Sequence, residues 1–191
     1  MVRKRCESSV CVKMKQESQV IQVEKVAKFY KVSFHQFLKD WKACFPNSTS
    51  VQIQNIYDEI KLPKRATKGS AGYDFYTPIT FVLPPQHTIK LPTGIRVKIQ
   101  EGWVLTLYPR SSLGFKYRLQ LDNSVGIIDS DYFSSDNEGH LFVKLTNDTN
   151  EGKTVNLRAG DAMLQGIFLP FGICEDDVCQ GVRNGGFGST N

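Results

Sequence analysis

The sequence predicts a mainly β protein with a small α/β extension at its N-terminus, on two observations. From residue 61 onward, short runs rich in branched and aromatic residues alternate with Pro and Gly turns, as in WVLTLYP and LFVKLTN, which is typical of a β-sandwich or barrel. Before that point, apolar residues recur at helical spacing. We find no βαβ alternation, heptad or internal repeat, so a doubly wound sheet, a coiled coil and a repeat array are excluded.

The distribution of charge separates the extension from the rest of the chain. The 191 residues carry a formal net charge of +5, and residues 1–45 hold ten Lys or Arg against four Asp or Glu. Basicity therefore belongs to the N-terminal segment, in which residues 1–20 are polar and show no period. We interpret these residues as a mobile, solvated tail rather than as a nucleic-acid-binding surface.

Residues 21–56 are expected to form the ordered part of the extension. A short strand is predicted at residues 20–23, and the capping box Ser33-x-x-Gln36 predicts the start of an amphipathic helix that ends before Pro46. A second helix is predicted over residues 49–60. The chain then divides into the tail at 1–20, the α/β extension at 21–56, a β core at 57–180 and a glycine-rich arm at 181–191.

Cysteine and histidine usage indicates neither a zinc site nor a disulfide framework. The five cysteines are odd in number and form no C-x-x-C pair, and the three histidines are scattered. No apolar run is long enough for a signal-peptide core or a membrane span. We therefore expect a reduced, cytoplasmic protein that does not associate with membranes.

The stretch NSVGIIDSDY, residues 123–132, places carboxylates in what is predicted to be an apolar strand. An unpaired carboxylate there is costly to desolvate, so Asp129 is expected to be partnered, partly hydrated or functional. Gly126 among β-branched residues indicates a bulge or the close approach of another group to the backbone. The alternative is an ordinary hairpin end, in which Asn, Gly, Asp and Ser are turn residues.

Two further polar clusters suit the binding of phosphate and of a base. Arg110, Ser111 and Ser112 follow a predicted strand, and they offer a planar guanidinium and two hydroxyls to phosphate oxygens. The alternative is a Pro-Ser turn with a surface arginine. Near the C-terminus, the run GGFGST lets the backbone approach a ligand closely while Phe187 offers a flat face for stacking. The alternative there is a frayed glycine-rich tail.

Five ordered blocks stand out between Lys61 and Thr190. The blocks are ATKGSAGYDFY (66–76), YPRSSLGF (108–115), NSVGIIDSDY (123–132), GDAMLQGIF (160–168) and NGGFGST (184–190). They resemble the five motifs of the trimeric deoxyuridine triphosphatase (dUTPase) family. One block would be a weak signal, whereas five in the same order are specific. The resemblance implies a jelly-roll or β-clip subunit, a threefold homotrimer with active sites at subunit interfaces, and Mg²⁺-dependent cleavage of dUTP to dUMP and pyrophosphate.

The same resemblance implies roles for individual residues. Asp129 is the general base for a water that attacks the α-phosphorus, and Gln165 helps to place that water or a phosphate. Asp74 contacts magnesium through water, because Mg²⁺ keeps several waters and takes direct ligands from the triphosphate. The implied substrate-binding residues are Arg110, Ser111, Ser112, Asn123, Gly126, Tyr132, Arg183, Phe187, Gly188 and Ser189.

Specificity in the family lies in the element that carries Asn123 and Tyr132. Its backbone and amide are implied to match the Watson–Crick edge of uracil and to leave no room for a C5 methyl. Tyr132 is implied to pack beneath the deoxyribose, so that a 2′-hydroxyl clashes.

The chain departs from the family pattern in three places. Residues 133–137 lengthen the element after Tyr132, Arg183 stands two places before Gly185 where three is the commoner spacing, and the extension has no counterpart in the core family. These features leave two alternatives open. One is a dUTPase-fold regulatory protein, in which nucleotide occupancy switches binding to a protein partner through the extension. The other is a relative of the dCTP deaminases, which these blocks resemble less well.

Overall fold

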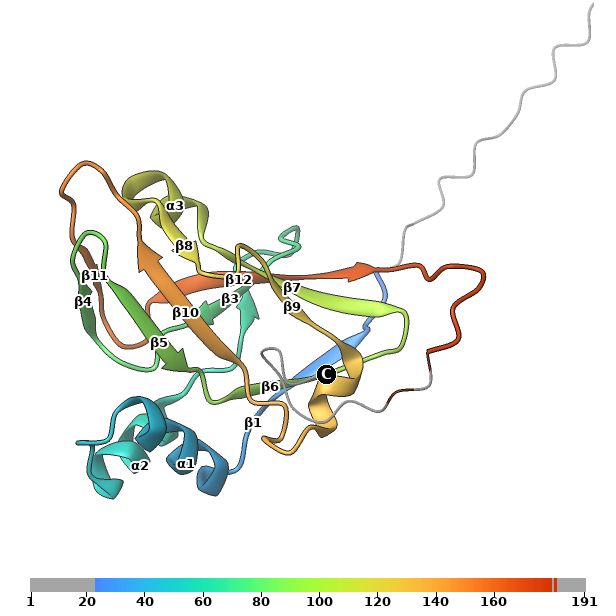
Figure 1. Cartoon of the computed structure of the whole chain (residues 1–191), viewed down its shortest axis with the longest axis horizontal. Coiled ribbons are helices and arrows are strands. Elements are labelled where there is room, and N and C mark those ends of the chain that lie inside the picture. Colours follow the sequence, from blue (N-terminus) through green and yellow to red (C-terminus); the bar gives the residue numbers. More distant parts are fainter. Residues whose placement is uncertain (1–22, 180, 182–191) are drawn as a thin grey trace, which may run out of the picture.

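The computed structural model describes residues 23–179 and 181, and within them the chain is mainly β. Two sheets face each other (Figure 1). In the first sheet all neighbours pair antiparallel, in the order β2 (Lys64–Arg65), β3 (Tyr73–Tyr76), β12 (Ala162–Pro170), β7 (Trp103–Pro109) and β9 (Gly126–Ile128). The second sheet is β5 (Thr88–Pro92), β10 (Phe142–Asn147) and β8 (Leu119–Leu121), and two smaller ladders pair β4 (Phe81–Leu83) with β11 (Val155–Leu157) and β1 (Ala27–Lys31) with β6 (Ile95–Ile99).

Strand β10 illustrates why the apolar runs fold as strands. Its sequence FVKLTN alternates, and Val143, Leu145 and Asn147 point to the buried face. The one polar member of that face is satisfied, because Asn147 Nδ2 donates to the carbonyl oxygens of Leu83 and Lys153, each at 2.9 Å. The strand predicted from LFVKLTN is therefore confirmed.

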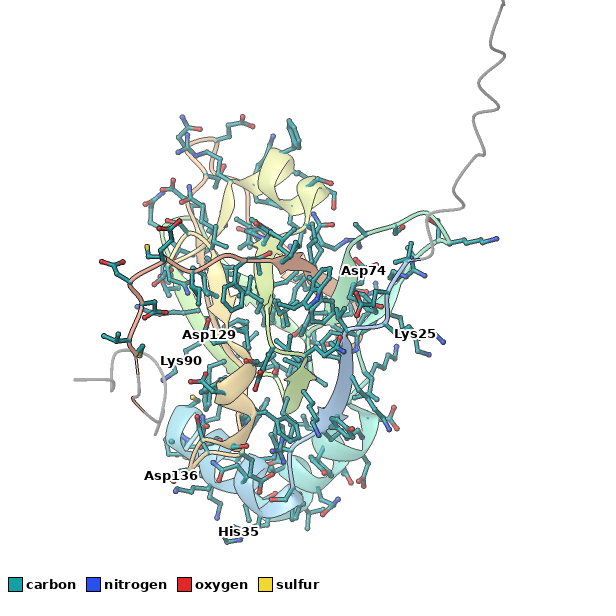
Figure 2. The ribbon with its side chains drawn as sticks, turned by 90° about the vertical axis from the view of Figure 1, so that its right-hand side faces the viewer. Lys25, His35, Asp74, Lys90, Asp129 and Asp136 are labelled. Atoms are coloured by element: carbon teal, nitrogen blue, oxygen red, sulfur yellow. The ribbon has the colours of Figure 1, made fainter. Side chains whose placement is uncertain are left out.

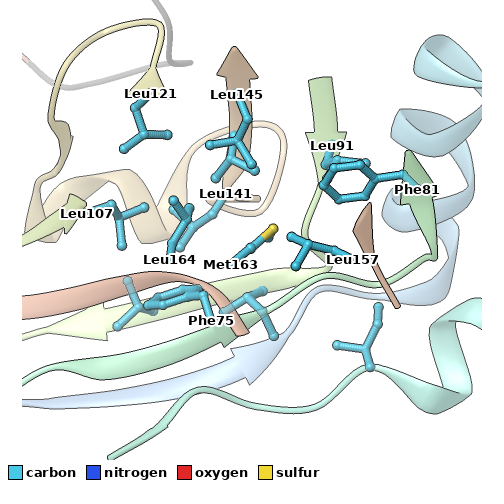
Figure 3. Close-up of a cluster of buried hydrophobic side chains, with 14 of the residues drawn as sticks. Phe75, Phe81, Leu91, Leu107, Leu121, Leu141, Leu145, Leu157, Met163 and Leu164 are labelled. Atoms are coloured by element: carbon cyan, nitrogen blue, oxygen red, sulfur yellow. The ribbon is translucent and has the colours of Figure 1, made fainter. Parts of the chain in front are cut away.

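The hydrophobic core lies between the two sheets (Figure 3). Each sheet contributes large side chains that are almost completely buried, and these form a continuous apolar layer. The mainly β fold predicted from the sequence is confirmed. The first sheet contributes Phe75, Leu107, Met163 and Leu164, and the second contributes Leu91, Leu121 and Leu145.

The two predicted helices of the extension are confirmed as α1 (Phe34–Cys44) and α2 (Ser50–Glu59). They lie at one end of the molecule, where α1 packs against α2 and β5 (Figure 1). Phe37, Trp41 and Ile53 are fully buried and belong to the same cluster as the sheet residues. The extension therefore shares the core of the β domain, and α2 runs across the boundary predicted at residue 57.

The structure describes only Val23 of the strand predicted at residues 20–23, and it contains a strand, β1, further along the chain. Val23 is exposed and irregular, and residues 20–22 lie outside the described residues. The observed strand β1 pairs along its whole length with β6, from Ala27 opposite Ile99 to Lys31 opposite Ile95. The prediction at residues 20–22 stays untested, and Val23 does not belong to a strand.

The caps of the two helices differ. Thr49 and Gln52 form a complete capping box at α2. At α1, Ser33 accepts from the backbone N–H of Gln36 as predicted, but the Gln36 side chain donates to Asp40 at 2.7 Å instead of returning to the cap. The Ser33 backbone N–H donates to Glu138, from the far end of the sequence, at 2.8 Å. The predicted capping box is thus half formed, because a distant carboxylate takes the second position.

Candidate active site

Three of the five blocks meet on adjacent strands of the first sheet. Asp74 on β3 pairs with Gln165 on β12, and Gln165 pairs in turn with Tyr108 on β7. Gln165 is half-buried and lies over Gly72, where an added Cβ would come within 3.0 Å of its side-chain oxygen. A larger residue at position 72 would therefore require this amide to shift by a few tenths of an ångström.

Arg110 joins this group from the end of β7, at the start of helix α3 (Ser111–Tyr117). Its Nε lies 3.3 Å from Asp74 Oδ1. Its backbone N–H donates to the carbonyl of Met163, the extra residue where the register of β12 against β3 shifts between Ala162 and Leu164. The bulge thus turns a carbonyl of β12 toward Arg110 and helps to hold its backbone near Asp74.

The group is open to solvent on its charged side. The Arg110 side chain is 41% exposed, and Ser111 and Ser112 are exposed in the first turn of α3, where backbone N–H groups have no intrahelical acceptor. We call Asp74, Arg110, Ser111, Ser112 and Gln165 the β3–β12–β7 cluster. Its donors suit an anionic ligand with several oxygens.

The third block lines a separate cavity of about 510 Å³, which we call the β9 cavity. Asn123, Gly126 and Tyr132 all lie on its wall. Gly126 pairs regularly with Leu107, and a Cβ added to it would meet the Leu107 Cβ at 3.0 Å. The close approach predicted at Gly126 is therefore the Leu107 side chain, and no bulge is present there. The remaining lining residues are Leu107, Leu121, Asp122, Val125, Ile127, Ile128, Phe142, Val143 and Lys144.

Asp129 and Tyr132 do not lie on a strand, contrary to the prediction. Strand β9 ends at Ile128, and Asp129 caps a short 3-10 helix, η1 (Ser130–Ser134), that contains Tyr132. This helix turns the Tyr132 ring back toward the cavity, where the residue is 5% exposed. Asp129 directly follows a residue of the cavity wall and is itself half-buried.

Asp129 and Arg110 lie at opposite ends of β7 within one subunit. The antiparallel register places Ile128 opposite Leu105, and the five residues from Leu105 to Arg110 extend over about 17 Å. Figure 2 shows Asp74 and Asp129 well apart in the same way. The two side chains cannot bridge that separation, so a single subunit does not bring Asp129 to the β3–β12–β7 cluster.

The sequence analysis missed an ion pair at the β9 cavity. Lys144 Nζ lies 2.8 Å from Asp122 Oδ2, and the Thr146 hydroxyl donates to Asp122 at 2.5 Å. Burial acts to raise the pKa of Asp122, but the hydrogen bonds from Lys144 and Thr146 and the charge of Lys144 outweigh it, so the pKa is lowered. The sequence did contain one signal for this ion pair, because the alternation of FVKLTN places Lys144 on the outward face of the strand.

No cluster of three or more His, Cys, Asp or Glu side chains that could hold a metal occurs in residues 23–179 and 181. Asp74 stands as a single carboxylate beside a guanidinium. That donor set does not form a complete metal site, but it fits Mg²⁺, which keeps waters and takes further oxygens from a phosphate ligand. Among the described helices, none is long and apolar enough to cross a membrane.

The predicted residues of the fifth block lie outside the described residues. These are Arg183, Phe187, Gly188 and Ser189.

A family model for dUTPase matches residues 58–191. The chain belongs to the dUTPase family. The deoxyuridine 5′-triphosphate nucleotidohydrolase of Lactococcus lactis is 44% identical over 134 residues, which cover 69% of this chain and 88% of that enzyme. A crystal structure of dUTPase from Streptococcus mutans, 40% identical, superposes with a TM-score of 0.54 over 62% of this chain and 91% of that one. The family model thus spans the β core and the arm of this dUTPase.

A second solved structure shares the fold at low identity. It is a dUTPase of Staphylococcus bacteriophage 80alpha, described among phage dUTPases that control the transfer of virulence genes. It is 19% identical, covers 84% of this chain and 100% of that one, and has a TM-score of 0.57. At that identity the likeness speaks for the fold alone.

Proposed function

We propose that Asp129 is the general base with which this dUTPase hydrolyses dUTP to dUMP and pyrophosphate. The observation that carries the proposal is the position of this carboxylate, next to the last residue of β9 and at the edge of the β9 cavity. Asp129 takes a proton from a water, whose oxygen attacks the α-phosphorus in line while pyrophosphate departs. This reaction removes dUTP that would enter DNA and supplies dUMP for thymidylate synthesis.

The β9 cavity takes the nucleoside in this proposal. Its volume and its mixed apolar and amide lining suit a base and a sugar. Asn123 and the backbone near Gly126 bind the Watson–Crick edge of uracil, and the Tyr132 ring packs beneath the deoxyribose. Leu107 packs closely against Gly126 and leaves little space between these two residues of the cavity wall. This close packing supports the rejection of a base that carries a C5 methyl group.

The β3–β12–β7 cluster takes the phosphates. Arg110, Ser111 and Ser112 bind the phosphate oxygens, and Gln165 helps to orient the water or a phosphate. Asp74 would hold Mg²⁺ when the triphosphate is bound. The ion supplies positive charge that offsets the charge of the phosphate chain.

The distance between Asp129 and the β3–β12–β7 cluster within one subunit supports an active site that is shared by subunits. Because Asp129 lies about 17 Å or more from Arg110 along β7, we assign them to two neighbouring subunits of a threefold homotrimer. The arm, with Arg183 at the γ-phosphate and Phe187, Gly188 and Ser189 at the nucleotide, closes the site from another subunit. A cytoplasmic location is proposed with this function, since exposed thiols such as Cys174 and Cys179 persist in a reducing compartment.

Pyrophosphate release measured with dUTP, dCTP, dTTP and UTP tests the function directly. We expect rapid release from dUTP and rates at least about 100-fold lower from the other three nucleotides. The different base edge of dCTP leaves buried polar groups of the site unpaired, and the methyl group of dTTP or the 2′-hydroxyl of UTP clashes with the cavity wall. Ammonia released from dCTP would instead support the deaminase alternative. Nucleotide binding without release from any of the four would support the regulatory alternative.

Activity restored by mixing two inactive proteins is the expected result for a shared site. One protein carries Asp129→Ala and the other ends after Val182, which removes the arm. After the two are unfolded together in equal amounts and reassociated, roughly one quarter of sites should combine an intact base with an intact arm. Each protein refolded alone is the control. A mixture that stays inactive would mean that the arm serves the Asp129 of its own subunit.

A further inference from the structure

Two departures from the family pattern, the N-terminal extension and the lengthened segment after Tyr132, contact each other in the fold. Residues of the extension, in helix α1 and its cap, bind the loop formed by residues 137–140. That loop ends the lengthened segment and precedes β10, whose first residues Phe142 and Val143 line the β9 cavity. The two departures therefore form one structural unit next to the proposed nucleoside site.

Glu138 makes the first connection. Its carboxylate accepts from the backbone N–H of Ser33 at 2.8 Å and from the Ser33 hydroxyl at 2.6 Å, and it lies 3.6 Å from Arg96 Nη1. Burial acts to raise the pKa of Glu138, but the two bonds from Ser33 and the charge of Arg96 outweigh it and lower the pKa. The anion is thus the form that the fold stabilises at neutral pH.

His140 makes the second connection and is 0% exposed. Its Nε2 accepts from the backbone N–H of Gly94 at 2.8 Å, so the ring proton lies on Nδ1 and is donated to Asp40 Oδ2 at 2.6 Å. Gln36 donates to the same carboxylate oxygen at 2.7 Å. The imidazole ring is therefore fixed from both sides, by α1 and by the turn before β6.

The same loop fixes Tyr132. The Tyr132 hydroxyl donates to the carbonyl oxygen of His140 at 2.8 Å, and Asn137 Nδ2 donates to the Tyr132 hydroxyl at 2.8 Å. The loop also packs directly on the backbone of Tyr132, since a Cβ added to Gly139 would lie 2.6 Å from the Tyr132 carbonyl oxygen. A continuous set of contacts thus runs from Asp40 through His140 to the ring that lines the β9 cavity.

We propose that helix α1 of the extension positions Tyr132 through the 137–140 loop, and thereby sets how strongly the β9 cavity prefers deoxyribose over ribose. The proposal rests on the proposed function, in which the Tyr132 ring lies beneath the sugar. Steric rejection of a 2′-hydroxyl depends on a wall that does not move, and a small displacement of the ring relaxes it. Asp40, Glu138 and His140 are positioning residues, and they do not touch the substrate.

The test replaces Asp40 by Asn, which keeps the size of the side chain and removes the charge that holds the His140 ring. Asp58→Asn is the matched control, because Asp58 is also a helix carboxylate that accepts from a glutamine four residues earlier, but on α2. We expect Asp40→Asn to lower the ratio of kcat/KM for dUTP to that for UTP by roughly 3- to 10-fold, within the range of couplings between contacting residues. The kcat of Asp40→Asn for dUTP should change by less than about twofold. The dUTP/UTP ratio of Asp58→Asn should change by less than about twofold as well.

A double variant separates positioning from a general loss of stability. Tyr132→Phe removes the hydroxyl that links the ring to His140, so adding Asp40→Asn to it should change the dUTP/UTP ratio much less than Asp40→Asn does alone. Glu138→Gln perturbs the same loop through a different contact, the one with Ser33. It tests the proposal if Asp40→Asn does not fold. A lower melting temperature with an unchanged ratio in the folded variants would overturn the proposal, as would additive effects in the double variant.

Binding of dUDP and UDP, measured by calorimetry on the same proteins, gives the same ratio without turnover. A parent protein that binds dUDP but releases no pyrophosphate from dUTP would contradict the proposed function and still report the preference for deoxyribose. We expect the ratio of the two dissociation constants to fall in Asp40→Asn by the same factor as the kinetic ratio. Equal ratios in the parent and in Asp40→Asn would overturn the role of α1 independently of catalysis.

Discussion

Asp129→Asn is expected to lower kcat for dUTP by about 10²- to 10⁴-fold, the usual contribution of a positioned general base. The substitution is nearly isosteric, and Asp129 is a half-buried residue directly after the last residue of β9. The fold, the assembly and the affinity for nucleotide should therefore be retained. Loss of turnover with retained binding is what distinguishes a base from a binding group.

Turnover at saturating dUTP and the dissociation constant of dUDP check this expectation. Asp136→Asn is the control, because Asp136 is an exposed carboxylate in the lengthened segment near the same helix. Its kcat should stay within about twofold of the parent, since surface substitutions away from special contacts have small effects. An Asp129→Asn protein that turned over within a few-fold of the parent would remove Asp129 from the role of base.

Removal of residues 1–56 is expected to prevent folding of the remaining chain. Phe37, Trp41 and Ile53 are fully buried, and burial of three such side chains contributes about 5–9 kcal/mol, which is comparable to the whole stability of a typical domain. The truncation also removes β1, which pairs with β6, and it removes Asp40, which is the hydrogen-bond partner of the buried His140. The fragment should aggregate or melt far below the parent.

Size-exclusion chromatography and thermal denaturation of the 57–191 fragment measure this effect. Removal of residues 1–20 alone is the control, and it should leave hydrolysis and the melting temperature unchanged, because a polar, charged segment offers little apolar area to bury. A 57–191 fragment as stable as the full chain would show that α1 and α2 contribute nothing to the core.

The sequence was sufficient for those elements whose signals are local. The strands were predictable from alternation, as in β10, and the helices from apolar spacing and from the cap residue Ser33. The second half of the cap at Ser33 was not predictable, because its partner Glu138 lies 105 residues away. The position of β1 depends on pairing with β6, which is distant in the sequence. The orientation of Tyr132 in η1 depends on its hydrogen bond to the carbonyl oxygen of His140.

For the site, the sequence identified residue types but not distances. Asp129, Gln165, Asp74 and Arg110 were all predicted as members of one site. Only strand order and register reveal that three of them meet at one end of β7 and that Asp129 lies toward the other. The pair of Asp122 with Lys144 was missed for the same reason, since Asp122 lies in the turn after β8 and Lys144 lies on β10.

In the proposed shared site, Asp129 and Arg110 come from different subunits, which makes catalysis depend on protein concentration. When a complete site requires two or more chains, the fraction of complete sites follows the assembly equilibrium rather than the amount of folded chain. Specific activity should then fall on dilution below the dissociation constant of the trimer and return when the protein is concentrated. A folded but dissociated subunit would hold an intact β9 cavity and an intact β3–β12–β7 cluster and still catalyse nothing.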